Sequence, residues 1–198
     1  MSKKIITISR QFGSGGRTIG KKTAEKLGYE FYDKEIIEKV AEESGFEKKF
    51  IEEEGEYSPS KSIFAYSFVG RSINGMSAND YILSVQRKII LNIAEKGNCV
   101  IVGRCADYIL KNRKDVLNIF VHADIAKRAE RIVKLYGETD EKPEKRLTEK
   151  DKKRSINYKY YTDQIWGMAE NYHLTLDSGV IGIDKCVDII VDLSSGLD

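Results

Sequence analysis

The chain has 198 residues, a length that suits one domain or one domain with a small inserted piece. Hydrophobic residues make up 41% and charged residues 32%, a globular composition that excludes a disordered or collagen-like chain. The net charge of +2 is too small to indicate binding to nucleic acid or to a membrane surface. No apolar run approaches the roughly 18 residues that a membrane span needs. We therefore expect neither nucleic acid nor a membrane as partner.

The three cysteines, Cys99, Cys105 and Cys186, are an odd number and contain no C-x-x-C pair. This usage indicates reduced thiols and argues against a disulfide or zinc framework. The segment before Ser9 has too few apolar residues for a signal peptide. Together these features predict a cytoplasmic protein.

The N-terminal part alternates predicted strands and helices. Ile5–Ile8 is β-branched throughout, and its continuous apolarity predicts a strand that is buried on both faces. A glycine cluster, Gly13–Gly16, follows it and precedes a helix over Arg17–Leu27 that Gly28 would end. Tyr29–Tyr32 predicts a short second strand.

Asp33 is expected to cap the next helix, whose apolar face carries Ile36, Ile37, Val40 and Ala41. Residues 45–77 are acidic and turn-like, and they predict a partly helical surface insertion. A further helix is expected over 79–95, with Gly97 closing it. Its apolar residues recur at helical spacing: Ile82, Val85, Ile89 and Ile93.

The second half continues the alternation. Strands are predicted at Cys99–Val102, Val116–Val121 and His173–Leu176, and helices at Ala106–Lys111, after Asp124 and at about Ile183–Val191. The helix after Asp124 has one apolar face, and its other face is expected to be solvated and carries Lys127, Arg128, Arg131 and Lys134. Lys142–Arg154 contains 7 basic and 3 acidic residues among 13, which is typical of a solvated helix face.

Five strands that alternate with helices predict an α/β fold, a parallel sheet of about five strands flanked by helices on both faces. Ligands of such sheets bind at the carboxyl ends of the strands. The glycine cluster and the Gly103–Arg104 turn both follow predicted strands. Both turns therefore fall at the expected ligand edge of a single domain that spans residues 1–198.

The glycine cluster is the most specific local signal. Backbone N–H groups at a glycine turn that opens a helix point toward one spot, and the helix N-terminus adds partial positive charge, so a phosphate can be cradled there. The P-loop pattern G-x-x-x-x-G-K-[ST] fits the window from Gln11 to Thr18 at its second glycine and its threonine. The first glycine is replaced by Gln11 and the lysine by Arg17. A glycine turn that only packs tightly is the alternative.

Several strings together resemble the cytidylate kinase-like proteins, a branch of the nucleoside monophosphate kinases. They are residues 6–17, Phe31 to Glu35, Gln86-Arg87, Val100 to Arg104, Asp151-x-x-Arg154 with the segment Tyr158 to Trp166, and Leu174 to Ser178. They cover nearly the whole chain, and their order and spacing carry the resemblance. It implies a P-loop kinase that moves the γ-phosphoryl group of ATP onto a nucleoside monophosphate, with CMP or dCMP as the first candidates.

The resemblance also implies roles for individual residues. The donor phosphates would lie on the loop formed by Gly13, Ser14, Gly15, Gly16, Arg17 and Thr18, with the Thr18 hydroxyl on Mg²⁺. Asp33, Arg87 and Arg104 would hold the acceptor. Residues 45–77 would form the acceptor-side insertion and residues 138–160 a lid. Arg154 would reach the transferred phosphoryl group and Asp151 would orient it, so Arg17, Arg154 and Asp151 are the catalytic candidates.

Two departures from the family pattern keep alternatives open. Arg17 stands where these kinases carry lysine, and Cys105 stands where they carry aspartate, with Asp107 two residues later. An acceptor other than a cytidine nucleotide, or a nucleotide-binding sensor with little turnover, is therefore also considered. Asp33 can be only a helix cap, and Arg87 only a surface residue. The oligomeric state is not indicated.

Overall fold

The computed structural model describes residues 4–49, 51 and 78–196. Five strands form one sheet in the order β2-β3-β1-β4-β5, and every neighbouring pair is parallel. The expected α/β fold is thereby confirmed. The strands are β1 (Ile5–Arg10), β2 (Glu30–Tyr32), β3 (Cys99–Val102), β4 (Val116–His122) and β5 (Leu174–Asp177).

Strand β1 lies in the middle of the sheet, because it pairs with β3 on one side and with β4 on the other. Ile8 lies opposite Val102 of β3 and Ile119 of β4, and all three side chains are buried. A central strand of a parallel sheet is covered on both faces, which explains the unbroken apolar run in the sequence. The segments that follow β1, β3 and β4 therefore leave the sheet at the same edge.

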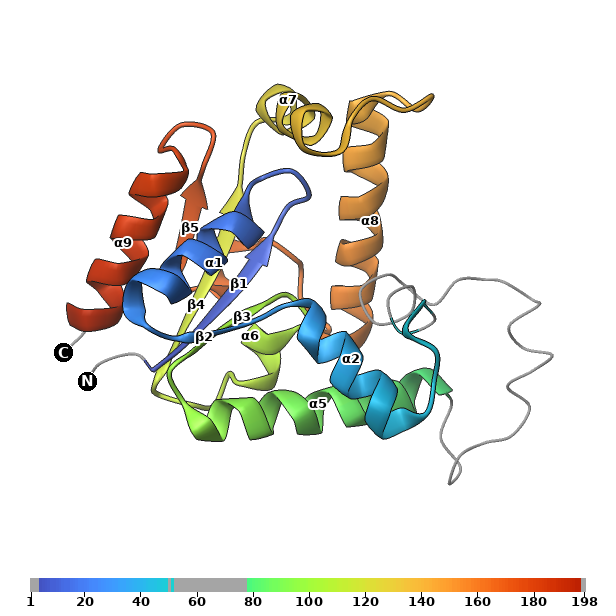
Figure 1. Cartoon of the computed structure of the whole chain (residues 1–198), viewed down its shortest axis with the longest axis vertical. Coiled ribbons are helices and arrows are strands. Elements are labelled where there is room, and N and C mark those ends of the chain that lie inside the picture. Colours follow the sequence, from blue (N-terminus) through green and yellow to red (C-terminus); the bar gives the residue numbers. More distant parts are fainter. Residues whose placement is uncertain (1–3, 50, 52–77, 197–198) are drawn as a thin grey trace.

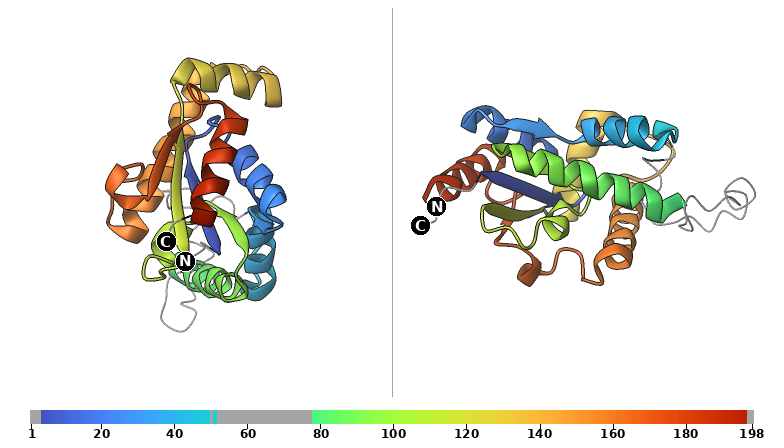
Figure 2. Two further views of the ribbon diagram at one scale, coloured as in Figure 1. Left: turned by 90° about the vertical axis from the view of Figure 1, so that its left-hand side faces the viewer. Right: turned by 90° about the horizontal axis from the view of Figure 1, so that it is seen from below.

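Helices cover both faces of the sheet (Figures 1 and 2). One face packs against α1 (Gly16–Leu27) and α9 (Ile183–Gly196). The other packs against α2 (Lys34–Ser44), α5 (Ala78–Lys96) and α6 (Ala106–Ile109). Gly28 and Gly97 follow α1 and α5 in left-handed conformations, with φ of 67° and 68°, and so end the helices as expected. Most of the predicted insertion at 45–77 lies outside the described residues.

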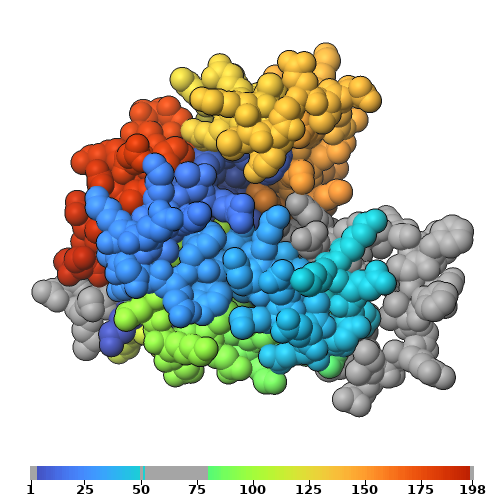
Figure 3. Space-filling view, viewed as in Figure 1, coloured from blue at the N-terminus to red at the C-terminus, as the bar shows by residue number. Residues whose placement is uncertain are grey.

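Two further helices, α7 (Ile125–Tyr136) and α8 (Pro143–Thr162), stand at the carboxyl edge of the sheet (Figure 1). They pack on one another through Ala129, Ile132 and Leu147. In the space-filling view the surface is hollowed between the yellow and orange atoms of these helices and the blue atoms of α1 and α2 (Figure 3). A short 3-10 helix, η1 (Ala169–Asn171), precedes β5. Helix α8 covers most of residues 138–160, where the lid is expected, and the lid itself stays a prediction.

The solvated face expected on α7 is wrong at one position. Asp124 caps α7 as predicted, with its carboxylate accepting a hydrogen bond from Ala126 N at 2.8 Å. Arg128, however, is 7% exposed, whereas the apolar side chains of Ile125 and Tyr136 on the same helix are 42% and 60% exposed. Asp151 of α8 contacts Arg128 of α7. This contact cannot be predicted from the periodicity of α7 alone. No helix in the described part of the chain is both long enough and apolar enough to span a membrane.

Candidate functional site

The loop between β1 and α1 has the backbone of an anion-binding turn. Gly13 and Gly15 have φ of 76° and 82°, in the left-handed region that glycine tolerates best. A Cβ on Gly15 would lie 2.4 Å from Cδ1 of Ile183, so a larger residue there would also displace that side chain. Left-handed residues that alternate with ordinary ones make successive N–H groups converge on one side and form a concave nest for anions. The nest opens directly into α1, which adds the partial positive charge of a helix N-terminus.

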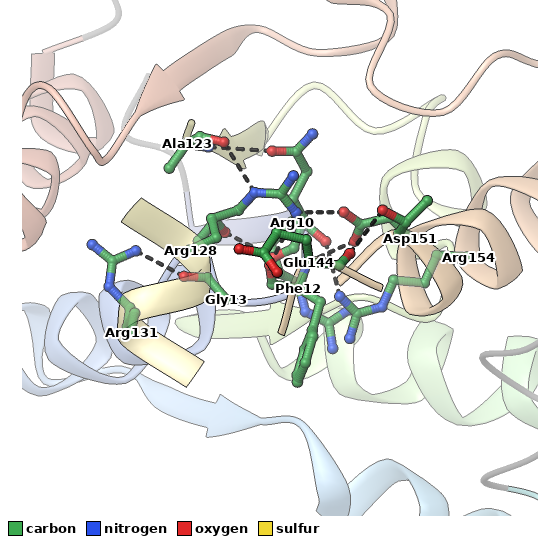
Figure 4. A network of polar contacts seen from close by, with 12 residues as sticks. Arg10, Phe12, Gly13, Ala123, Arg128, Arg131, Glu144, Asp151 and Arg154 are labelled. Carbon is green, nitrogen blue, oxygen red and sulfur yellow. Dashed lines mark hydrogen bonds and ion pairs between the residues drawn. The ribbon is translucent and has the colours of Figure 1, made fainter. Parts of the chain in front are cut away.

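The carbonyl groups of this loop are held from outside by side chains, most of them from other elements (Figure 4). Five consecutive carbonyls, of residues 10–14, each accept a hydrogen bond from a side chain. The donors, in that order, are Arg154, Ser14, Arg128, Arg131 and Ser178. Since the carbonyls are tied back toward the protein, the loop is fixed in the conformation that presents its amide groups.

Asp151 of α8 joins this arrangement from the opposite side. Its Oδ1 accepts a 2.7 Å hydrogen bond from the backbone N–H of Phe12, and its Oδ2 lies 2.6 Å from Nη1 of Arg128. The same Arg128 nitrogen donates to the Phe12 carbonyl at 3.2 Å. Figure 4 shows the Asp151 carboxylate between these groups. Asp151 therefore lies beside the loop, and its observed contacts are with the protein's own backbone and with Arg128.

A pocket adjoins the loop at the carboxyl ends of β1 and β3, and three arginines converge on it: Arg10, Arg104 and Arg154. Arg104 is 6% and Arg154 9% exposed, so their charges are largely shielded from solvent. Largely buried guanidinium groups favour a multiply charged anion, because an arginine fork can bind two phosphate oxygens at once. The remaining lining residues are Ser9, Gly103, Cys105, Asn157, Tyr158 and Trp166.

The turn that carries Arg104 is strained. Gly103, Arg104 and Cys105 are consecutive left-handed residues, with φ of 76°, 60° and 53°. A non-glycine residue in this region costs on the order of 1 kcal/mol or more, and such residues cluster at ligand sites. The turn is held by Gly103 N, which donates to Ile8 O at 3.0 Å, and by the Gln86 amide, which donates to Arg104 O at 3.2 Å.

Asp107 lies behind the pocket and is 3% exposed. Tyr158 donates to its Oδ2 at 2.6 Å, and Ser9 donates to its Oδ1 at 3.4 Å. Burial raises the pKa of this carboxyl above its ordinary value, and the hydrogen bond from Tyr158 opposes the rise. Asp107, the first carboxyl after Arg104 in the sequence, is thus enclosed by protein groups.

The predicted site residues fall into two groups. Gly13–Gly16, Arg104, Asp151 and Arg154 meet at the loop and the pocket. Arg17 and Asp33 are ion-paired with each other on the outer side of α1, where the Arg17 side chain is 56% exposed, and Asp33 makes no capping hydrogen bond to α2. Thr18 is exposed in the first turn of α1, and Arg87 is exposed on α5. Arg87 does not line the pocket.

From the sequence, three arginines and one asparagine of the site were given no role or a solvated position: Arg10, Arg128, Arg131 and Asn157. Arg10 and Asn157 line the pocket, and Arg128 and Arg131 hold the loop. Arg10 ends the first strand directly before the glycine cluster, so its position next to the loop was available as a signal. The roles of Arg128 and Asn157 depend on how α7 and α8 pack, which no local pattern records.

Comparison with known proteins agrees with this geometry. The model of the cytidylate kinase-like family matches residues 5–180. A cytidylate kinase of Pyrococcus horikoshii is 30% identical over 159 residues, covering 78% of this chain and 71% of that protein. A cytidylate kinase of Methanopyrus kandleri is 26% identical over 199 residues, covering 94% and 90%.

Solved structures support the fold. The crystal structure of an uncharacterized protein from Eubacterium ventriosum has a TM-score of 0.72 at 24% identity and covers 96% of this chain and 97% of that chain. A shikimate kinase from Acinetobacter baumannii in complex with shikimate has a TM-score of 0.54 at 16% identity, with coverages of 96% and 92%. With a five-stranded parallel sheet, a glycine loop at its carboxyl edge and a family match over most of its length, this chain belongs to the cytidylate kinase-like family.

Proposed function

We propose that the protein transfers the γ-phosphoryl group of ATP to a nucleoside monophosphate, with CMP or dCMP as acceptor. The observation that carries this proposal is the pocket that Arg10, Arg104 and Arg154 line, directly beside the glycine loop. Phosphoryl transfer requires alignment and neutralisation of charge far more than covalent catalysis. A loop for the donor phosphates next to arginines for the acceptor phosphate meets both requirements.

The chain's own residues would divide the work as follows. Amide groups of Gly13–Gly16 would hold the donor phosphates, because the left-handed conformations of Gly13 and Gly15 fit a concave turn whose N–H groups converge on an anion. Thr18 stays a candidate for holding Mg²⁺, which would neutralise charge on the donor. Arg104 would hold the acceptor phosphate, and Arg154 would stabilise charge on the group in transfer. Asp33 and Arg87 stay candidates for acceptor binding.

Asp151 would act through the loop rather than on the substrate. Its carboxylate holds Phe12 N–H and Arg128, so it fixes the entrance of the glycine loop relative to α8. A residue of this kind orients the phosphates by fixing the backbone that binds them. We therefore propose Asp151 as a positioning residue.

A second candidate acceptor class is favoured by Asp107. Acidic groups near the base would read the amino group of cytosine, yet the Asp107 carboxyl is buried and accepts hydrogen bonds from Tyr158 and Ser9. Cys105 occupies the position directly after Arg104. This arrangement supports a kinase for another small phosphorylated or hydroxylated acceptor.

The experiment that tests the function is a coupled ADP-release assay with Mg²⁺ and ATP and a panel of acceptors. The panel is CMP, dCMP, UMP, AMP and a set of small hydroxylated metabolites, and a reaction without acceptor measures ATP hydrolysis. Acceptor-dependent ADP release with CMP or dCMP supports the proposal. Turnover with UMP or AMP supports a nucleoside monophosphate kinase of another base specificity, and turnover with a hydroxylated metabolite supports the second candidate. No acceptor-dependent turnover contradicts both.

A further inference from the structure

The glycine loop lacks a lysine, and the structure places glycine where it would stand. In the P-loop pattern the lysine directly follows the second glycine of the turn that opens the helix. Here the N-cap is Gly15, with φ of 82°, and α1 begins at Gly16. With Gly15 as the second glycine of the pattern, the lysine position is Gly16, one residue before Arg17. The Arg17 side chain is directed to Asp33 on the outer side of α1.

Arg10 occupies the space that a side chain on Gly16 would need. A Cβ built on Gly16 would lie 2.5 Å from Cβ and 3.0 Å from Cγ of Arg10. Carbon atoms that are not bonded to each other do not approach so closely, so the arginine stem and a side chain at position 16 exclude each other. The stem of Arg10 therefore starts where the side chain of a loop lysine would start, although it is attached to β1 rather than to α1.

The far end of Arg10 reaches the acceptor side of the site. A Cβ built on Gly103 would lie 2.1 Å from Nη1 and 3.1 Å from Cζ of Arg10, so the guanidinium group rests on the backbone of the Gly103–Arg104 turn. It lines the same pocket as Arg104 and Arg154. Two glycines thus make room for one side chain, Gly16 at its base and Gly103 at its tip. The charge lies between the donor loop and the acceptor arginines.

We propose that Arg10 is the loop cation of this enzyme and binds the phosphoryl group in transfer, in place of a lysine on the helix. The proposal rests on the proposed phosphoryl transfer, and it assigns a residue to the donor side of that site. An arginine fork can bind two phosphate oxygens and keeps its charge at every physiological pH. Because Arg10 supplies this charge, the replacement of the loop lysine gives no reason to expect a sensor without turnover.

The test measures binding of inorganic tripolyphosphate by isothermal titration calorimetry, because this probe needs the donor loop but neither Mg²⁺ nor an acceptor. We expect Arg10→Met to weaken the affinity about tenfold or more, equivalent to about 1.4 kcal/mol. Arg17→Met is the matched variant, because it removes the same charge one residue beyond Gly16, and a loss of less than about threefold is expected. Arg10→Lys, which keeps a charge on the same stem, should lie between Arg10→Met and the parent.

An exchange of positions makes the test sharper. Gly16→Lys alone should weaken binding, because the new side chain collides with the Arg10 stem. Gly16→Lys combined with Arg10→Gly removes the collision, and the lysine on α1 then supplies the charge that Arg10 supplied. The affinity should therefore recover to within about threefold of the parent. Such a recovery would show strong coupling between the two positions. Thermal unfolding of each variant shows whether it is folded, and if Arg10→Met does not fold, Arg10→Lys and the exchange carry the test.

Two results would overturn the proposal: parent-like affinity in Arg10→Met, or a larger loss in Arg17→Met than in Arg10→Met. A parent protein that does not bind tripolyphosphate would overturn it as well. Failure of the proposed function is distinguishable, since it would leave Arg10-dependent tripolyphosphate binding intact while no acceptor supports ADP release.

Discussion

The carboxylate of Asp151 lies 2.6 Å from the guanidinium group of Arg128, and both side chains are nearly buried, at 15% and 9% exposure. The pair joins α8 to α7, and each partner also binds the backbone of Phe12. The contact is therefore a junction of three elements rather than an isolated ion pair.

Removing one partner of this pair should be costly. We expect Asp151→Asn and Arg128→Met each to lower the free energy of unfolding by about 3 kcal/mol, because an uncompensated charge or an unpaired backbone group is left in a largely shielded place. The double variant should lose less than the sum of the two. Urea unfolding followed by circular dichroism measures these values.

The control for that cycle is the exposed pair of Lys159 and Asp163, which lies at the far end of α8. Lys159→Met should leave the urea midpoint nearly unchanged, since solvent already screens the pair. Additive losses in the Asp151 and Arg128 double variant would show that the two side chains act independently.

Arg104 and Arg87, the two arginines proposed for acceptor binding, are expected to differ in their effect on kcat/KM. Arg104→Met should lower kcat/KM for the acceptor about a hundredfold, because a largely buried charge at the pocket is lost. Arg87→Met should lower it less than tenfold, since Arg87 is exposed on α5. Steady-state kinetics with the acceptor varied measures both values, and equal losses would place Arg87 at the acceptor as well.

Gly103 should be more sensitive to substitution than its backbone conformation alone requires. Gly103→Ala and Gly28→Ala both put alanine at a left-handed position, with φ of 76° and 67°. A Cβ on Gly28 meets nothing within 4 Å, whereas a Cβ on Gly103 collides with Arg10. We expect both variants to lose on the order of 1 kcal/mol of stability, with a further loss and a reduced kcat only for Gly103→Ala. Thermal unfolding and the ADP-release assay measure the two quantities, and matching losses in both variants would argue against the contact with Arg10.

Asp107 predicts a specific dependence of stability on pH. Because burial raises its pKa above the ordinary value of 3.8, the folded state favours the protonated carboxyl. The resulting stability is fully present below pH 3.8 and is lost as the pH rises through the higher, folded-state pKa. The neighbouring Tyr158 and Tyr172 stay protonated in this range, since burial raises the pKa of both phenols.

Asp107→Asn stays neutral at every pH and is the matched variant. Relative to the parent, it should become more stable as the pH rises from about 4 to 8, as the linkage relation requires. Urea unfolding at a series of pH values measures the difference. A constant difference, or one that favours the parent more at high pH, would contradict an elevated pKa.

The sequence predicted the sheet, the order of its strands along the chain and the glycine turn between β1 and α1, because these depend on local patterns. Continuous apolar runs mark central strands, and a glycine cluster after a strand marks a turn into a helix. Gly28 and Asp124 delimit helices as expected for the same reason. The Gly103–Arg104 turn was also placed correctly, because its edge of the sheet follows from the strand that precedes it.

The contacts between distant elements could not be predicted in this way. Arg128 lies on the side of α7 that is polar by pattern, and it is buried because it contacts Phe12 of the loop and Asp151 of α8. Asp33 directly precedes α2, as a cap should, yet its carboxylate is ion-paired with Arg17 of α1. The position of Arg10 beside Gly16 could not be predicted either. The close approach of the two residues, in which a Cβ on Gly16 would collide with Arg10, arises only when β1 and α1 are packed together.

The hydrogen bonds that hold the carbonyls of residues 10–14 bear on the entropy of binding. A free glycine-rich loop loses more backbone freedom on ordering than any other kind of segment, on the order of 1–2 kcal/mol per residue. Here side chains of α7, α8 and the β5–α9 turn have already ordered it during folding. A phosphate that binds to this loop does not have to order it, so its affinity is not lowered by this entropy. The entropic cost of ordering the loop lowers the stability of the fold instead.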